Sequence, residues 1–139
     1  MARIKLLDKV APEEGTYTIK FDFKDEIGTL VIPTAINWWL SDLNGDIINN
    51  RSEVAATPAN PYYLTMKGAD LRLHQVESNE DFRVVTLRGT YNSDRGSSLP
   101  FTYAVMFKLK NFLIIAKPLY VEVIDHIFLG EFPVCSTPA

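Results

Sequence analysis

The chain has 139 residues, of which 47% are hydrophobic and 22% charged, the composition of an ordinary globular domain rather than a disordered segment. The formal net charge of -3 excludes a general nucleic-acid binder, because such proteins need a basic face. The single cysteine, Cys135, excludes an internal disulfide framework. We therefore expect a soluble domain that binds no nucleic acid directly.

Neither a targeting segment nor a membrane span is predicted. Residues 1–5 contain no apolar stretch and no cleavage site, so a classical secretion signal is not expected. No apolar run approaches the roughly 20 residues that a spanning helix needs. The longest run, residues 112–116, is followed directly by Lys117-Pro118. These features predict a soluble protein that is not secreted through a signal peptide.

The clearest strand signal lies early in the chain. Residues 16–23 alternate between apolar and polar side chains, which is the period-2 pattern of a half-buried strand. The apolar set is Tyr17, Ile19, Phe21 and Phe23.

A second strand is predicted over residues 36–41, followed by a turn. Because neighbouring strand residues face opposite sides, Trp38 and Trp39 cannot point the same way. Asn44-Gly45 is typical of a two-residue hairpin turn, with residues 46–49 returning as the second arm. If Trp38 joins the core, Trp39 lies on the outer face and needs a partner strand, another subunit or a ligand.

Further short strands are predicted over residues 62–66, 83–91 and 101–109, with a loop over residues 92–100. Strands at regular spacing, without a convincing amphipathic helix, favour an all-β fold. A tryptophan on a central strand is typical of immunoglobulin-like sandwiches. We predict an immunoglobulin-like antiparallel β-sandwich, with an OB-type or other small barrel as the alternative.

Two regions are predicted: residues 1–111 form the sandwich, and residues 112–139 form an apolar C-terminal extension. The extension either adds strands or a helix to the same domain or serves as an assembly arm buried against a neighbouring subunit, since large apolar patches mark interfaces. The candidate protein-interface residues are Trp39, Phe112, Ile114, Ile115, Leu119, Tyr120 and Phe128.

No catalytic, cofactor or metal site is predicted. The acidic turn over residues 42–46, with Glu53 beyond it, resembles a calcium loop in its oxygen ligands, but Ile47 occupies the position that requires glycine. A plain hairpin turn is therefore favoured. His74 and His126 have no second ligand at metal-binding spacing, and Cys135 has no activating motif. We expect no enzyme activity.

Aromatic side chains offer a different kind of site. Trp39, Tyr62 and Tyr63 form a candidate stacking platform for sugars. The alternative is that these rings fill the core or a subunit contact, where aromatic residues are also enriched.

The sequence also resembles a known protein family. The segments that carry the resemblance are Glu14-Gly15-Thr16-Tyr17-Thr18-Ile19, Ile32-Pro33-Thr34-Ala35-Ile36-Asn37-Trp38, Leu43-Asn44-Gly45-Asp46-Ile47-Ile48-Asn49 and Arg88-Gly89-Thr90-Tyr91-Asn92-Ser93-Asp94. Together they are similar to small immunoglobulin-like structural proteins of tailed bacteriophages, over roughly residues 3–113.

The resemblance implies a non-enzymatic virion protein, made in the host cytoplasm, that acts as a head-tail connector, a tail component or a capsid-decoration protein. Its implied partners are other virion proteins and copies of itself in a symmetric assembly, without direct contact to nucleic acid or membrane. The alternative function is a carbohydrate-binding or host-adhesion module that uses the exposed aromatic rings.

Overall fold

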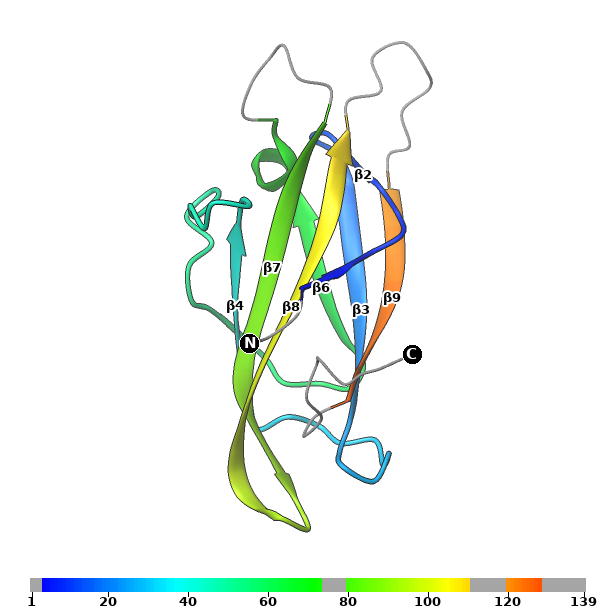
Figure 1. Cartoon of the computed structure of the whole chain (residues 1–139), viewed down its shortest axis with the longest axis vertical. Coiled ribbons are helices and arrows are strands. Elements are labelled where there is room, and N and C mark those ends of the chain that lie inside the picture. The colour runs from blue at the N-terminus through cyan, green and yellow to red at the C-terminus, as the bar shows by residue number, and fades with distance from the viewer. Residues whose placement is uncertain (1–3, 74–79, 111–119, 129–139) are drawn as a thin grey trace.

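The structure is a computed structural model that describes residues 4–73, 80–110 and 120–128 (Figure 1). Its elements are β1 (Ile4–Leu6), β2 (Ala11–Pro12), β3 (Thr16–Lys24), β4 (Ala35–Ser41), β5 (Val54–Ala56), β6 (Tyr62–Lys67), the 3-10 helix η1 (Gly68–Leu71), β7 (Glu80–Ser93), β8 (Gly96–Lys110) and β9 (Tyr120–Phe128). In these described ranges no α-helix is present, and no helix has the length and apolar character to cross a membrane.

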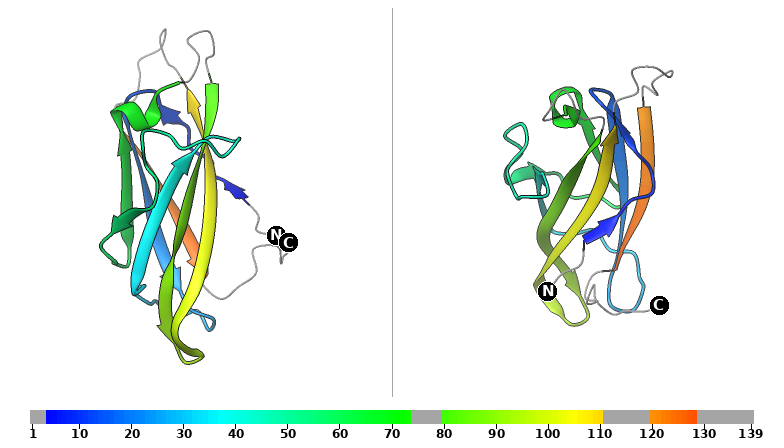
Figure 2. Two further views of the ribbon diagram at one scale, coloured as in Figure 1. Left: turned by 90° about the vertical axis from the view of Figure 1, so that its left-hand side faces the viewer. Right: turned by 45° about the horizontal axis from the view of Figure 1, so that its top comes forward.

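The strands form two packed sheets. Sheet A has the strand order β1-β8-β7-β4-β5, with β2 also paired to β8, and sheet B has the order β6-β3-β9. Figure 2 shows the two sheets as two layers of the molecule. The predicted all-β sandwich is confirmed at this level.

The prediction of a purely antiparallel sandwich is wrong, because both sheets are mixed. β1 and β2 run parallel to β8, and β9 runs parallel to β3. Each parallel pair joins segments that are far apart in the chain. The alternation of apolar and polar residues determines which face of a strand is buried, but it carries no information about the direction of the neighbouring strand.

The core lies between β3 of sheet B and the central strands of sheet A. All four apolar residues predicted to face inward from β3 are fully buried, namely Tyr17, Ile19, Phe21 and Phe23. The Tyr17 ring stacks on Phe107 of β8, with 4.5 Å between ring centroids. This contact holds the two layers together through the interior.

β7 and β8 form a hairpin that is longer than the sequence predicts. Residues 92–100 were expected to be a loop, but β7 continues to Ser93 and β8 begins at Gly96. Ser93 pairs with Gly96, and the backbone N–H of Ser98 donates to the Asn92 side-chain oxygen at 2.8 Å. The polar residues of this tip lie on exposed strands, where a loop-like composition is tolerated because neither face needs burial.

The chain after β4 also differs from the prediction. The expected returning arm over residues 46–49 is reduced to one isolated bridge between Ser41 and Ile47, and β5 pairs with β4 instead. The Asp42 carboxylate accepts the backbone N–H groups of Asn44 and Asp46, at 2.9 and 3.0 Å. The Asp42 carboxylate, which resembled a calcium ligand in the sequence, thus stabilises its own turn.

β9 belongs to the predicted C-terminal extension, and it is a strand of sheet B. It pairs with β3 along its whole length, from Thr16 opposite Tyr120 to Lys24 opposite Phe128. Val123 and Ile127 point into the core and are buried. This part of the extension therefore packs on the same chain.

Candidate functional site

Trp39 lies on the outer face of sheet A, as predicted. β4 alternates along its length, so that Ile36, Trp38 and Leu40 are buried while Trp39 is only half-buried. The Arg51 guanidinium lies 5.8 Å from the centroid of the Trp38 ring, at the margin of the core. The two adjacent indoles therefore have separate roles, one in packing and one at the surface.

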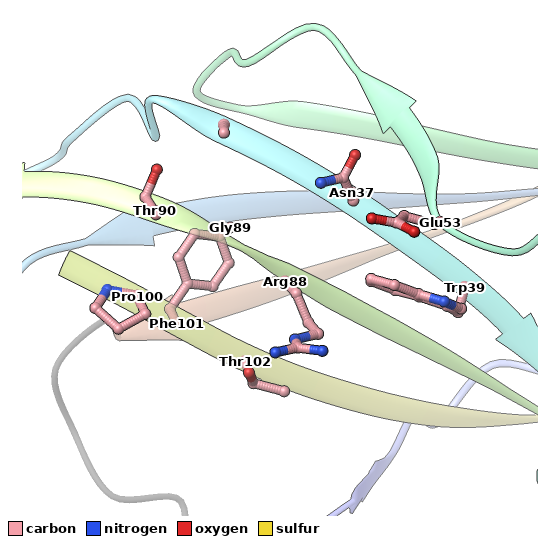
Figure 3. A pocket seen from close by; sticks show the side chains of 10 residues that line it. Asn37, Trp39, Glu53, Arg88, Gly89, Thr90, Pro100, Phe101 and Thr102 are labelled. Atoms are coloured by element: carbon pink, nitrogen blue, oxygen red, sulfur yellow. The ribbon is translucent and has the colours of Figure 1, made fainter. Parts of the chain in front are cut away.

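A hollow of about 460 Å³ lies beside Trp39 (Figure 3). Three strands of sheet A and the segment before β5 line it, through Ala35, Asn37, Trp39, Glu53, Arg88, Gly89, Thr90, Pro100, Phe101 and Thr102. Gly89 shapes the base of the hollow, because a Cβ atom there would lie 1.9 Å from the Ala35 carbonyl oxygen. Only glycine allows β4 to approach β7 this closely.

Side chains of opposite charge, Arg88 and Glu53, line the hollow together with the indole. The Arg88 guanidinium carbon lies 5.9 Å from the centroid of the Trp39 ring, within cation–π range. Figure 3 shows Glu53, Arg88 and Asn37 lining the same hollow as Trp39. Glu53 has a φ of 50°, a left-handed backbone conformation that is uncommon for a residue other than glycine. The hollow thus combines an aromatic face, a cation, an anion and an amide.

An apolar row extends the outer face of sheet A away from this hollow. The strand registers place Ile4, Ala104, Thr86 and Trp39 side by side across β1, β8, β7 and β4. In the next row, Leu6 lies beside Met106 of β8. The side chains of Ile4 and Leu6 are 48% and 55% exposed, so this side of the sheet presents apolar surface to solvent.

The structure does not bring the three predicted sugar-platform rings onto one face. Trp39 lies on the outer face of sheet A, whereas Tyr62 and Tyr63 belong to β6 of sheet B. Tyr63 is exposed, with the Lys20 ammonium 6.0 Å from its ring centroid, and Tyr62 is partly buried against the core. Burial accordingly raises the pKa of Tyr62. A platform built from all three rings does not form.

Most of the predicted C-terminal interface residues cannot be placed on a surface. Phe112, Ile114, Ile115 and Leu119 lie outside the described residues. Tyr120 and Phe128 are the first and last residues of β9, and their side chains are outside the description. Of the predicted interface set, Trp39 is the residue whose side chain is located.

Of the two histidines and the cysteine, only His126 lies within the described residues. His126 Nδ1 lies 3.0 Å from Asp22 Oδ2 on the outer face of sheet B, while His74 and Cys135 fall outside the described residues. Among the residues that the structure describes, no group of three His, Cys, Asp or Glu side chains is placed to hold a metal ion.

Two buried carboxylates have structural partners. Asp70 accepts hydrogen bonds from Asn49 Nδ2 at 2.8 Å and from Arg51 Nε at 2.9 Å. Asp125 of β9 accepts a hydrogen bond from Lys5 Nζ at 2.6 Å. Burial, together with the negative charge of Asp125, raises the pKa of the nearby Tyr103 hydroxyl. These clusters hold segments of the fold together.

Sequence reasoning singled out Trp39 but missed its neighbours in the hollow. Asn37, Glu53 and Arg88 come from three separate segments, and only the β4–β7 pairing of Asn37 with Arg88 brings two of them together. The alternation of residues 83–91 could have indicated that Arg88 faces outward and can therefore lie near Trp39. No protein-family model and no curated protein matches the sequence.

Proposed function

We propose that this chain is a non-enzymatic structural protein of a tailed-bacteriophage virion: a head-tail connector, a tail component or a capsid-decoration protein. It contacts other virion proteins and copies of itself, and its sandwich is of the immunoglobulin-like kind. The proposal combines the sequence resemblance over roughly residues 3–113 with the surface that surrounds Trp39.

The observation that carries the proposal is the pairing of Trp39 with Arg88 on the outer face of sheet A. Tryptophan and arginine are enriched among the residues that contribute most to protein–protein binding. Ile4 and Leu6 continue the same face with exposed aliphatic side chains. A sheet face with an aromatic–guanidinium pair and exposed aliphatic side chains farther along it suits contact with another protein. In a closed ring, this face would meet a different patch of the next copy.

The test is incorporation into particles. Purified virions of the encoding phage are expected to contain the chain in fixed stoichiometry, as measured by mass spectrometry. Trp39→Ala should reduce incorporation at least about tenfold, since a central tryptophan commonly contributes 2 kcal/mol or more to an interface. Tyr63→Ala, on the opposite sheet, is the matched control and should leave incorporation unchanged. Absence of the wild-type chain from virions would contradict the proposal.

A carbohydrate-binding or host-adhesion module is the second candidate, and the hollow itself favours it. Asn37 and Glu53 place an amide and a carboxylate beside the indole, which are groups that hydrogen-bond sugar hydroxyls. The position of Arg88 near the Trp39 ring weighs against it, because the guanidinium competes for the stacking surface. This candidate predicts saturable binding on a glycan array that is lost in Trp39→Ala and retained in Tyr63→Ala.

A further inference from the structure

β9 forms one edge of sheet B, at the right-hand side of Figure 1. Within the described ranges, no strand pairs with its other side. The Glu122 carbonyl accepts a hydrogen bond from Lys9 Nζ at 3.0 Å, so the backbone of Glu122 faces away from β3. Because backbone direction alternates along a strand, the N–H and C=O groups of Ile124 and His126 face the same open side.

Lys9 contacts this edge at the Glu122 carbonyl, and the strand itself lacks the features by which proteins usually block strand addition. Exposed edges are commonly protected by lysine, proline, bulges or very short strands. β9 has nine residues, with neither lysine nor proline among them, and its pairing with β3 is regular from end to end. β6, at the other edge of sheet B, starts directly after Pro61 and ends at Lys67. β9 is therefore the better candidate for pairing with another strand.

The residue order of β9 is self-complementary about Ile124. In an antiparallel pairing of two identical strands centred on that residue, Glu122 lies opposite His126 of the partner subunit, and the same pair recurs on the other side of the axis. Ile124 is 52% exposed and lies opposite its own symmetry copy. The register also places positions 120 and 128 opposite each other.

From this regular edge and its self-complementary residue order, we propose that β9 pairs antiparallel with β9 of a second copy of this chain, about a twofold axis at Ile124. The two three-stranded sheets then form one continuous sheet across the dimer. Main-chain hydrogen bonds supply the binding, and the acid–base pair of Glu122 and His126 fixes the register. This surface is separate from the Trp39 face, so that face stays open for other contacts.

The contacts of Lys9 and His126 bear on the pairing. The Lys9 ammonium must leave the Glu122 carbonyl, and this costs little because the contact is exposed to solvent. His126 also contacts Asp22 of β3 at 3.0 Å. The partner subunit's Glu122 therefore approaches an imidazole that is already oriented by a carboxylate.

The test measures the mass of the full-length chain in solution by light scattering and analytical ultracentrifugation over a concentration series. A dimer is expected. Glu122→Lys places a cation opposite the imidazole at two symmetric positions and should weaken the dimer about tenfold. The double variant Glu122→Lys with His126→Glu restores an opposite-charge pair and should recover most of the affinity. Ile124→Pro removes an outward-facing N–H without removing a bond to β3, and should give a monomer.

Circular dichroism confirms that each variant is folded, and hydrogen exchange provides an independent measure. The amides of Ile124 and His126 are expected to become protected as the concentration rises. A strictly monomeric wild-type chain would overturn the proposal. A dimer that survives both Glu122→Lys and Ile124→Pro would overturn it as well, and so would a dimer that dissociates on Trp39→Ala alone. This last result would still support the proposed function.

Discussion

Asp70 shows how one side chain secures the segment that follows β4. It is fully buried within η1, yet it contacts Asn49 and Arg51 of the segment after β4 and the backbone N–H of Lys67. Burial opposes ionisation of this carboxylate. The hydrogen bonds from Arg51, Asn49 and Lys67 outweigh that effect and lower the pKa of Asp70.

Replacing this carboxylate tests its contribution to stability. Asp70→Asn is expected to reduce the free energy of unfolding by about 2 kcal/mol at neutral pH, because an amide cannot accept all of these hydrogen bonds. The folded pKa lies below the unfolded value, so the stabilisation is present above the unfolded value and disappears as the pH falls through the folded one. Urea unfolding at neutral pH and at decreasing pH should show the difference from wild type shrinking in acid.

The control for this comparison is Asp46→Asn, at an exposed position in the same connection. It should change the free energy of unfolding by less than about 0.5 kcal/mol. A difference between Asp70→Asn and wild type that stays constant into strong acid would rule out the charged network as the source of stability.

At the scale of elements, the alternation of side chains along β9 places one set of residues in the core and the other set at the surface. Val123 and Ile127 face the core, while Ile124 and His126 face solvent. Isoleucine occurs on both faces of the strand, which explains why its sequence is equally compatible with an assembly arm. Because β9 pairs with β3, its inner residues pack in the core, and its outer residues remain at the surface where a partner can contact them.

The two isoleucines of β9 make a matched pair for testing this assignment. Ile127→Ala should lower the free energy of unfolding by about 2–4 kcal/mol, because it leaves a cavity between the sheets. Ile124→Ala should change it by less than about 0.5 kcal/mol. Denaturant unfolding at a protein concentration too low for self-association measures both values. Equal effects of the two substitutions would mean that β9 does not pack on the chain in this way.

At the scale of the whole molecule, one ion pair connects the first strand of sheet A to the last strand of sheet B. Lys5 of β1 donates to Asp125 of β9 over 2.6 Å, and the Asp125 side chain is fully buried while Lys5 is half-exposed. The contact links the two sheets through one side-chain pair between β1 and β9. It also joins residues that are 120 positions apart in the chain.

Removing only the lysine should therefore be costly. Lys5→Ala is expected to lower the free energy of unfolding by about 2–3 kcal/mol, because the buried Asp125 carboxylate loses its cation. Adding Asp125→Asn should restore part of this loss, and a double-mutant cycle would measure the coupling. Lys9→Ala, which removes an exposed lysine contact to β9, is the control with a small effect. Strict additivity of the two substitutions would argue against the ion pair.

Much of the local structure followed from the sequence alone. Alternation over residues 16–23 correctly placed Tyr17 and Phe21 in the core, and the same logic separated Trp38 from Trp39. These predictions succeeded because a period of two is a local property, set by the backbone geometry of each strand. The all-β class followed from the same patterns.

The tertiary structure alone decided which strands pair and in which direction. The parallel pairing of β9 with β3, and the meeting of Asn37, Glu53 and Arg88 around Trp39, depend on contacts between segments that are distant in the chain. Such contacts are selected by packing and by the backbone hydrogen bonds of the complete sheets. No local pattern encodes them, because alternation assigns the faces of a strand but leaves its neighbours undetermined.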